Sequence, residues 1–344
     1  MHLHHHPCNR KPFTTIFFVF LLYLNLHNQQ IVEARNPSQF TTNNPSLDVS
    51  IPEIKRHLQR YGYLPQNNEP DDVSFEQALA RYQKNLGLPI TGKPDSDTLS
   101  QILLPRCGFP DDVEPKTAPF HTGKKYVYFP GRPRWTRDVP LKLTYAFSQE
   151  NLTPYLAPTD IRRVFRRAFG KWASVIPVTF IETEDYVIAD IKIGFFNGDH
   201  GDGEPFDGVL GVLAHTFSPE NGRLHLDKAE TWAVDFDEEK STVAVDLESV
   251  AVHEIGHVLG LGHSSVKDAA MYPTLKPRSK KVNLNMDDVV GVQSLYGTNP
   301  NFTLSSLLAS ETSTNLADDG SMIRSQGMIY SSLSTVIALC FLNW

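Results

Sequence analysis

Apolar residues at helical spacing mark the first folded unit of the chain. Between residues 50 and 104, three short stripes of apolar residues recur every three or four positions. The stripes are Ile54, Leu58 and Tyr61; then Phe75, Leu79, Tyr82 and Leu86; then Leu99, Ile102 and Leu103. Residues at this spacing share one face of a helix. This stretch therefore predicts a small bundle of three helices.

A mixed pattern of strands and longer helices follows up to Gly297. Residues 141–147 alternate between apolar and polar, and residues 178–181 and 191–196 are short apolar runs, as in strands. Residues 159–172 carry an apolar stripe opposite several arginines, which predicts a helix that begins after Thr159 and has one solvated face. A strand at 231–236, a helix at 247–259 and a final helix from about 285 to 296 complete an α+β pattern.

The helix at 247–259 carries residues typical of a catalytic zinc site. His253 and His257 are four positions apart, so both imidazoles can lie on one face. Gly260 lets the backbone leave the helix sharply, which would bring His263 round as a third ligand. Three histidines and a position open to water are typical of catalytic zinc, whereas a structural site is closed by a fourth protein ligand. Glu254 would lie close enough to the water to act as its base.

The complete motif, His-Glu-x-x-His-x-x-Gly-x-x-His, resembles that of the metzincin metalloproteases. Partly buried histidines on an ordinary amphipathic helix would not require the glutamate, the glycine or the third histidine. Met271 matches the methionine turn of this clan, and Ser264 resembles the matrixin branch, the matrix metalloproteinases. The resemblance implies a catalytic domain with a twisted, mostly parallel five-stranded sheet and three helices, preceded by a small three-helix propeptide domain.

Cys107 is the one cysteine outside the terminal segments that we expect to be removed, which contain Cys8 and Cys340. The mature zymogen could then form no internal disulfide, and an odd thiol in a secreted protein indicates a reactive role. The run Pro-Arg-Cys-Gly-Phe-Pro-Asp around Cys107 resembles the matrixin cysteine switch, in which a propeptide thiolate occupies the fourth zinc position. The resemblance assigns Arg106 and Asp111 to holding this loop.

A glycine- and acid-rich loop at 199–208 opens a second group of metal-ligand residues. His200, Asp202, His215 and His225 would supply three nitrogens and one oxygen, a closed set suited to structural zinc. Scattered surface histidines would give a similar pattern, but matrixins carry the same order. His57 and His121 fall outside both groups, and we expect them to be ordinary surface residues.

The same region carries oxygen donors suited to calcium. The resemblance assigns one calcium ion to Asp207, Gly208, Leu210, Val212, Asp227 and Glu230. A second calcium site of the family would use Asp190 and an aspartate at a position where this chain has Arg223. That substitution argues against the second site.

The ends of the chain predict processing. A basic start and a short apolar run predict a signal peptide over residues 1–34, with an N-terminal membrane anchor as the alternative. Residues 35–125 would form the propeptide, whose bundle resembles peptidoglycan-binding domains, and residues 126–297 the catalytic domain. Residues 298–320 look like a polar stalk, and residues 321–344 resemble a GPI-attachment signal with attachment at Gly320. A loosely amphipathic tail on a soluble enzyme is the alternative.

This organisation resembles that of plant matrixins and implies a secreted, latent zinc endopeptidase, anchored to the outer face of the plasma membrane or released to the extracellular matrix. Asn151 and Asn301 begin glycosylation sequons. The partners would be extracellular protein substrates and an activating protease that cleaves near 123–125, and the enzyme would be a monomer. A formal net charge of −7 gives no reason to expect nucleic-acid binding. The alternatives are a catalytically silent zinc-binding surface protein, which would not need Glu254, and a wall-binding role for the bundle.

Substrate would lie extended along the strand that contains Leu213 and Ala214, by backbone pairing as in the resembled family. Residues 273–275 would form a wall of the main specificity pocket.

Overall fold

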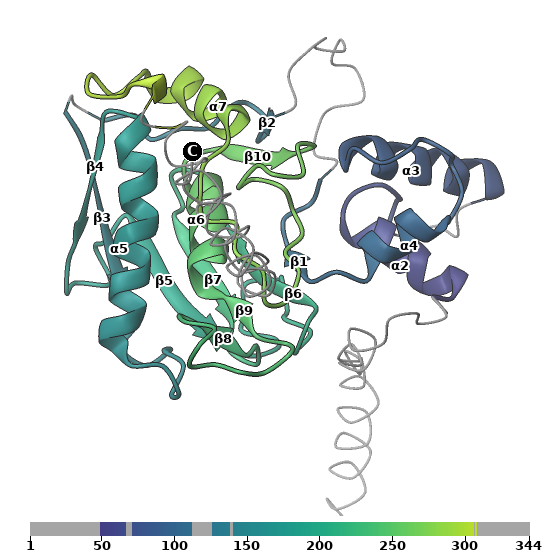
Figure 1. Ribbon diagram of the computed structural model, residues 1–344, viewed down its shortest axis with the longest axis horizontal. Coiled ribbons are helices and arrows are strands. Elements are labelled where there is room, and N and C mark those ends of the chain that lie inside the picture. The colour runs from purple at the N-terminus through teal and green to yellow at the C-terminus, as the bar shows by residue number, and fades with distance from the viewer. Residues whose placement is uncertain (1–48, 67–70, 112–125, 138–139, 306, 308–344) are drawn as a thin grey trace, which may run out of the picture.

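The computed structural model describes residues 49–66, 71–111, 126–137, 140–305 and 307. Within these residues the chain forms a small helical bundle beside a larger α+β domain (Figure 1). No helix in this part of the chain has both the length and the apolar character needed to cross a membrane. The predicted signal peptide, the cleavage region at 123–125, His121 and the GPI signal with Gly320 lie outside the described residues.

The bundle consists of the three predicted helices, each with its own N-cap. They are α2 (Ile51–Arg60), α3 (Asp72–Asn85) and α4 (Ser96–Ile102). Asp71 and Asp95 accept hydrogen bonds from backbone N–H groups in the first turns of α3 and α4, which satisfies donors that a helix leaves free. The apolar stripes meet in one core around Leu58, Leu79 and Tyr82.

His57 departs from the prediction. Although we expected it on the surface, it is only 7% exposed and packs against the rings of Tyr61 and Tyr82. Its position one turn before Tyr61 places it on the apolar face of α2.

The larger domain is built on one sheet of six strands, ordered β1-β6-β7-β5-β3-β4. The strands are β1 (Arg106–Cys107), β3 (Leu141–Phe147), β4 (Val178–Glu182), β5 (Ile191–Phe196), β6 (Val212–Thr216) and β7 (Arg223–Asp227). Within the sheet only the β6–β7 pair is antiparallel. Strands β3 to β7 are the predicted mostly parallel five-stranded sheet. The sixth strand, β1, comes from the segment after the bundle and adds to the edge of β6.

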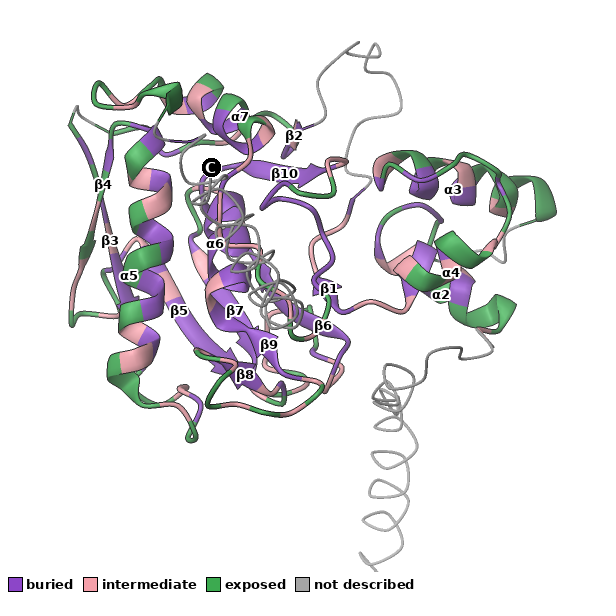
Figure 2. Cartoon of the chain, in the orientation of Figure 1, coloured by how far each residue is buried: buried purple, intermediate pink, exposed green. Residues whose placement is uncertain are grey.

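Two helices, α5 (Pro158–Val175) and α6 (Leu247–Val258), lie side by side against the sheet, and α7 (Met286–Tyr296) follows near the end of the described chain (Figure 1). The indole N–H of Trp172 on α5 donates to the carbonyl of Val252 on α6 at 2.9 Å. Figure 2 shows α6 buried along its length, and Glu248 is its one residue that is not buried. The histidine motif on α6 therefore lies inside the domain.

The remaining strands are short. They are β2 (Tyr126–Tyr128), which pairs antiparallel with β10 (Leu261–Ser264), and β8 (Trp232–Ala233), which pairs parallel with β9 (Val245–Asp246). The α+β prediction with three helices in each unit is confirmed.

Two local predictions were wrong. The strand expected at 231–236 covers only β8, because the chain turns into the acidic loop after it. The helix α5 begins at Pro158 with Ala157 as N-cap, ahead of Thr159. Proline at the first helical position has its φ preset for the helix and loses no hydrogen bond there.

Candidate active site and metal centres

The three motif histidines meet at one point. His253 and His257 extend from α6, and β10 supplies His263. The Nε2 atom of His257 lies 3.1 Å from that of His253 and 3.2 Å from that of His263. Gly260 makes this possible: its φ is +99°, and a Cβ there would lie 2.3 Å from the carbonyl oxygen of Pro133. A side chain at this position would push the turn away from the site.

The opposite ring nitrogens fix the orientation of each imidazole. The Nδ1 atoms of His253 and His257 lie 2.7 Å from the carbonyl oxygens of Ala270 and Leu261. Because a carbonyl only accepts, Nδ1 carries the proton and Nε2 presents a lone pair to the centre. Burial lowers the pKa of all three histidines, which keeps them neutral. Three neutral nitrogens converging at 3.1–3.2 Å are the donor set that zinc requires.

Cys107 provides the fourth atom of this cluster. Its Sγ lies 3.4 Å from His257 Nε2, and the four potential ligand atoms lie within 4.8 Å of one another. Burial and the nearby Glu254 raise the pKa of the thiol, whereas a bound cation would favour the thiolate. The backbone N–H of Phe109 points at the sulfur from 3.4 Å and would also stabilise a negative charge there.

The loop around Cys107 is held by a buried ion pair. The Arg106 guanidinium lies 2.6 Å from Asp111 Oδ1 and stacks 3.6 Å above the ring of Tyr61. Tyr63 donates its hydroxyl to the other carboxylate oxygen at 3.0 Å. The structure thus brings Arg106 and Asp111 together, as the sequence predicted, and ties both to the helical bundle.

Asp111 also forms a hydrogen bond with one of the candidate zinc ligands, which the sequence did not reveal. Its Oδ1 accepts from His263 Nδ1 at 2.6 Å. Burial alone would raise the pKa of Asp111, but the charge of Arg106 and the hydrogen bond from His263 outweigh it and hold that pKa well below its usual range. The carboxylate therefore stays ionised between two donors.

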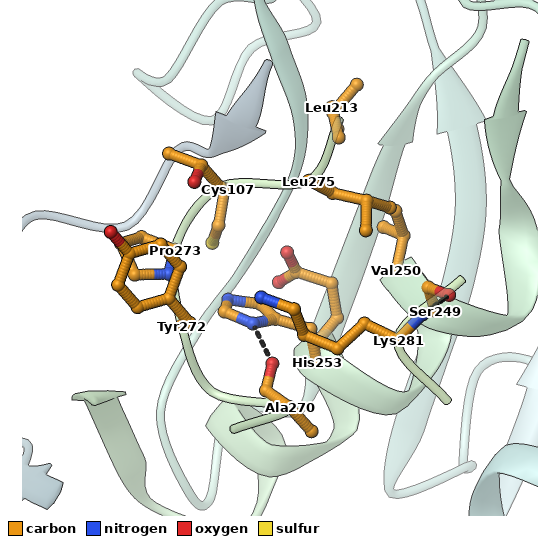
Figure 3. Close-up of a pocket in the computed structure, with 12 residues that line it drawn as sticks. Cys107, Leu213, Ser249, Val250, His253, Ala270, Tyr272, Pro273, Leu275 and Lys281 are labelled. Carbon is orange, nitrogen blue, oxygen red and sulfur yellow. Dashed lines mark hydrogen bonds between the residues drawn. The ribbon is translucent and has the colours of Figure 1, made fainter. Parts of the chain in front are cut away.

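Glu254 lies beside the cluster with one free carboxylate oxygen. Oε2 accepts from the hydroxyl of Thr216 at 2.6 Å, and Oε1 has no hydrogen-bond partner within the described residues. Burial raises the pKa of Glu254 to about 7. A pocket next to it is lined by Cys107 and His253, whose side chains are drawn in Figure 3. A carboxylate with this pKa can take up and release a proton near neutral pH.

Thr216 was missed by the sequence analysis, because strand spacing places it next to His215 but does not show which helix it faces.

The methionine turn packs directly beneath the helix. A Cβ at Gly256 would lie 2.2 Å from the sulfur of Met271, so only glycine admits this contact. Asp288, which the sequence analysis did not single out, accepts the backbone N–H groups of Ala270 and Met271 at 2.8 and 3.0 Å. This anchors the turn whose Ala270 carbonyl orients His253.

The second histidine cluster also assembles. Asp202 Oδ2 lies 2.9 Å from His200 Nε2, 2.8 Å from His215 Nε2 and 2.8 Å from His225 Nδ1. His215 and His225 are direct partners across the antiparallel strands β6 and β7, which points both rings to the same side. Burial lowers the pKa of both to about 4, so they are neutral ligands at physiological pH. Three imidazole nitrogens around one carboxylate fit structural zinc.

The predicted calcium residues come together from two segments, the loop 207–212 and residues 227–230. Asp207, Asp227 and Glu230 each accept a backbone N–H from the loop, donated by Val212, Gly208 and Leu210 respectively. Glu230 Oε2 is buried and has no hydrogen-bond partner among the described residues. Burial, together with the negative neighbours, raises the pKa of Asp227 to about 6 and that of Glu230 well above its usual value. Buried carboxylates that repel one another in this way fit a site for a cation with oxygen ligands.

Asp190 is engaged elsewhere. Arg137 lies 2.5 Å from its Oδ1, and Thr144 donates its backbone N–H to Oδ2 at 2.7 Å. Arg223, which stands where the second calcium site would need an aspartate, stacks 3.9 Å above Phe217. Both contacts argue against a second calcium ion at this position, and its absence stays a prediction. Of the two sequon residues, Asn301 is exposed and Asn151 is partly buried.

Comparisons with known proteins agree with this geometry. Residues 134–297 match the family model for Matrixin, and residues 48–102 match that for a putative peptidoglycan binding domain. The chain is 95% identical over 344 residues to Metalloendoproteinase 4-MMP of Arabidopsis thaliana, covering both chains completely. It is 56% identical over 269 residues to Metalloendoproteinase 1-MMP of the same plant, covering 76% of this chain and 73% of that one. It is also 37% identical over 269 residues to the interstitial collagenase of Sus scrofa, covering 76% of this chain and 52% of that one. The chain therefore belongs to the matrixins, a family of zinc metalloendopeptidases.

Proposed function

We propose that this matrixin is a secreted, latent endopeptidase of extracellular proteins, with Glu254 as its general base and Cys107 as the residue that keeps it inactive. The observation that carries the proposal is the convergence of three neutral imidazoles, one thiol and one carboxylate of raised pKa. We assign catalytic zinc to His253, His257 and His263.

Zinc held there would acidify a water molecule and polarise the scissile carbonyl. Glu254 accepts the proton of the attacking water and delivers it to the leaving nitrogen. Its Oε1 is free to do so, while the Thr216 hydroxyl fixes Oε2. In a catalytically inactive zinc-binding protein, a buried carboxylate with one unpaired oxygen beside the ligands would cost free energy and have no role.

Latency follows from where β1 lies. The backbone of the propeptide follows β6, with Arg106 N–H donating to Gly211 O at 3.1 Å and Gly108 N–H donating to Ala214 O at 2.8 Å. This is the strand edge along which we expect substrate to pair. The propeptide therefore covers the substrate path and presents Cys107 to the metal at the same time.

The other assignments remain part of the proposal. Structural zinc is assigned to His200, Asp202, His215 and His225. Calcium is assigned to Asp207, Gly208, Leu210, Val212, Asp227 and Glu230. The proposed domain boundaries are those expected from the sequence, and residues 1–34 and 321–344 are removed. An activating protease cleaves the chain before the catalytic domain, and a GPI anchor is attached at Gly320. Release of surface protein by a phosphatidylinositol-specific phospholipase tests the anchor, and protein that stays on the surface would contradict it.

Cleavage of a quenched fluorescent peptide tests the activity. The secreted protein is assayed before and after a thiol-modifying mercurial, with a zinc chelator and Glu254→Ala as controls. We expect activity to appear on thiol modification and to vanish in both controls, and Cys107→Ser to be active without the mercurial. If zinc-loaded, folded protein stays inactive after loss of the propeptide, the silent zinc-binding alternative replaces this proposal.

A further inference from the structure

The pocket beside the metal centre has apolar walls and one cationic member. Leu213, Val250 and Leu275 contribute aliphatic surface, and Tyr272 contributes its ring. Lys281 lines the same pocket, and Figure 3 shows its side chain running from beside Ser249 toward His253. Nothing in the motifs assigns a role to this lysine.

Lys281 is held in place from its backbone outward. Its N–H donates to the Ser249 hydroxyl at 2.7 Å, which ties it to α6. Its Nζ lies 4.7 Å from the centre of the Tyr272 ring, which is a favourable position for a cation. The Ser249 contact therefore fixes the backbone of Lys281, and the Tyr272 ring holds its ammonium beside the pocket.

The charge of Lys281 is only partly compensated. Within the described residues, no carboxylate lies within ion-pair distance of its Nζ. Burial lowers the pKa of Lys281 to about 8, opposed by the more distant charges of Asp288 and Asp268. The side chain thus remains mainly protonated at pH 7, and an ammonium has three N–H donors to offer.

A substrate side chain entering this pocket would meet that charge. The free volume of the cavity is about 20 Å³, close to the space of one water molecule, so an incoming side chain must displace or touch its lining. Glu254 also lines the pocket. Residues 273–275, which we expect to form a wall of the main specificity pocket, line it as well, and we assign the pocket to the substrate residue on the amine side of the scissile bond.

We propose that Lys281 is a specificity-determining residue that selects this substrate side chain by charge, favouring glutamine or glutamate over lysine or arginine. The inference rests on the proposed function and deepens it. A carboxylate or carboxamide oxygen can accept from the ammonium while its methylenes contact the apolar walls. A cationic side chain would instead bring a like charge into a pocket of low dielectric.

A set of peptides tests the proposal with the full chain after mercurial activation. The peptides differ only in the residue after the scissile bond, which is leucine, glutamine, glutamate or lysine, and kcat/KM is measured at pH 7. We expect the glutamate peptide to exceed the lysine peptide by roughly 10- to 100-fold, the range of a charge-assisted hydrogen bond. Equal rates for these two peptides would overturn the proposal without any variant.

Variants then locate the effect. Lys281→Met should reduce the glutamate-to-lysine ratio to within about threefold, and Lys281→Glu should invert it, because the charge has been removed or reversed. Lys276→Met removes the same charge from an exposed position of the same loop and should leave the ratio as in the wild type. Thermal melting shows whether each variant is folded. A ratio unchanged in folded Lys281→Met protein would refute the role of Lys281.

Failure of the activity itself can be told apart. If the wild-type enzyme cleaves none of the peptides, including the leucine peptide, the proposed function fails. The affinities of the same peptides for mercurial-treated Glu254→Ala protein, measured by fluorescence anisotropy, still decide the inference. The order glutamate above lysine supports it, and equal affinities overturn it.

Discussion

The hydroxyl of Thr216 is expected to set the lower pH limit of catalysis. It donates to Glu254 Oε2 at 2.6 Å, at a site where Glu254 is fully buried and its other oxygen has no partner among the described residues. Thr216→Val keeps the shape of the side chain but removes this donor. The ionised form of Glu254 then loses its main hydrogen bond inside the protein.

The size of the effect follows from the kind of bond lost. A hydrogen bond to a charged group contributes about 1.5–3 kcal/mol, and about 1.4 kcal/mol corresponds to one pKa unit. Burial already raises the pKa of Glu254 to about 7, and the Thr216 hydrogen bond lowers it. Its loss should therefore raise the pKa by about 1–2 units. Since the base must be ionised to accept a proton, the acidic limb of the pH profile moves to higher pH.

The assay is kcat/KM for one quenched peptide as a function of pH, with mercurial-activated enzyme. Thr216→Ser is the matched control, because it retains the hydroxyl and should keep the wild-type acidic limb. At pH 6 the valine variant should lose roughly 100-fold or more relative to its own plateau, whereas the wild type, whose base has a pKa of about 7, should lose roughly 10-fold. If the acidic limbs of the wild type and of Thr216→Val coincide, the hydroxyl does not tune Glu254 and this reasoning is wrong.

Three further outcomes are expected. The Gly108→Ala zymogen should cleave peptide without a mercurial, since the added Cβ would lie 2.7 Å from Val212 Cγ1 and push β1 off the sheet edge. Gly170→Ala is the control: its Cβ would meet nothing within 4 Å, so this zymogen should stay latent. Latency should be stable at neutral pH and weaken as the pH falls below about 4. The reason is that a carboxylate of lowered pKa such as Asp111 stabilises the docked propeptide only while it is ionised. Peptide cleavage is measured after acid treatment, and a zymogen that stays latent after acid would contradict this prediction. Calcium removal by EGTA should lower the melting temperature, by an amount that corresponds to about 2.7 kcal/mol of stability when calcium had been present at 100 times its Kd. Glu230→Gln should reduce this dependence on calcium. Identical melting of the wild type with and without calcium would contradict the calcium site.

Much of the site could be predicted because its information is local. The four-residue spacing of His253 and His257 places them on one face of any helix, and Gly260 is needed wherever a helix must end so sharply. The caps Asp71 and Asp95 act within three residues of themselves. Side chains that act over one turn can be read without knowledge of the rest of the fold. The start of α5 was misplaced because Thr159 is the better cap by residue type, whereas the helix begins with proline at Pro158.

Only the tertiary structure decided which distant groups complete the site. Asp111 reaches His263 across 152 positions, and Thr216 reaches Glu254 across 38. Arg137 takes up the carboxylate of Asp190, and Lys281 enters the pocket beside His253. Each of these contacts depends on the register of a strand or on the packing of one segment against another, which no local spacing encodes. The sequence alone thus determined the candidate metal ligands and the class of chemistry, while the packed fold determined the protonation and the orientation of the groups around them.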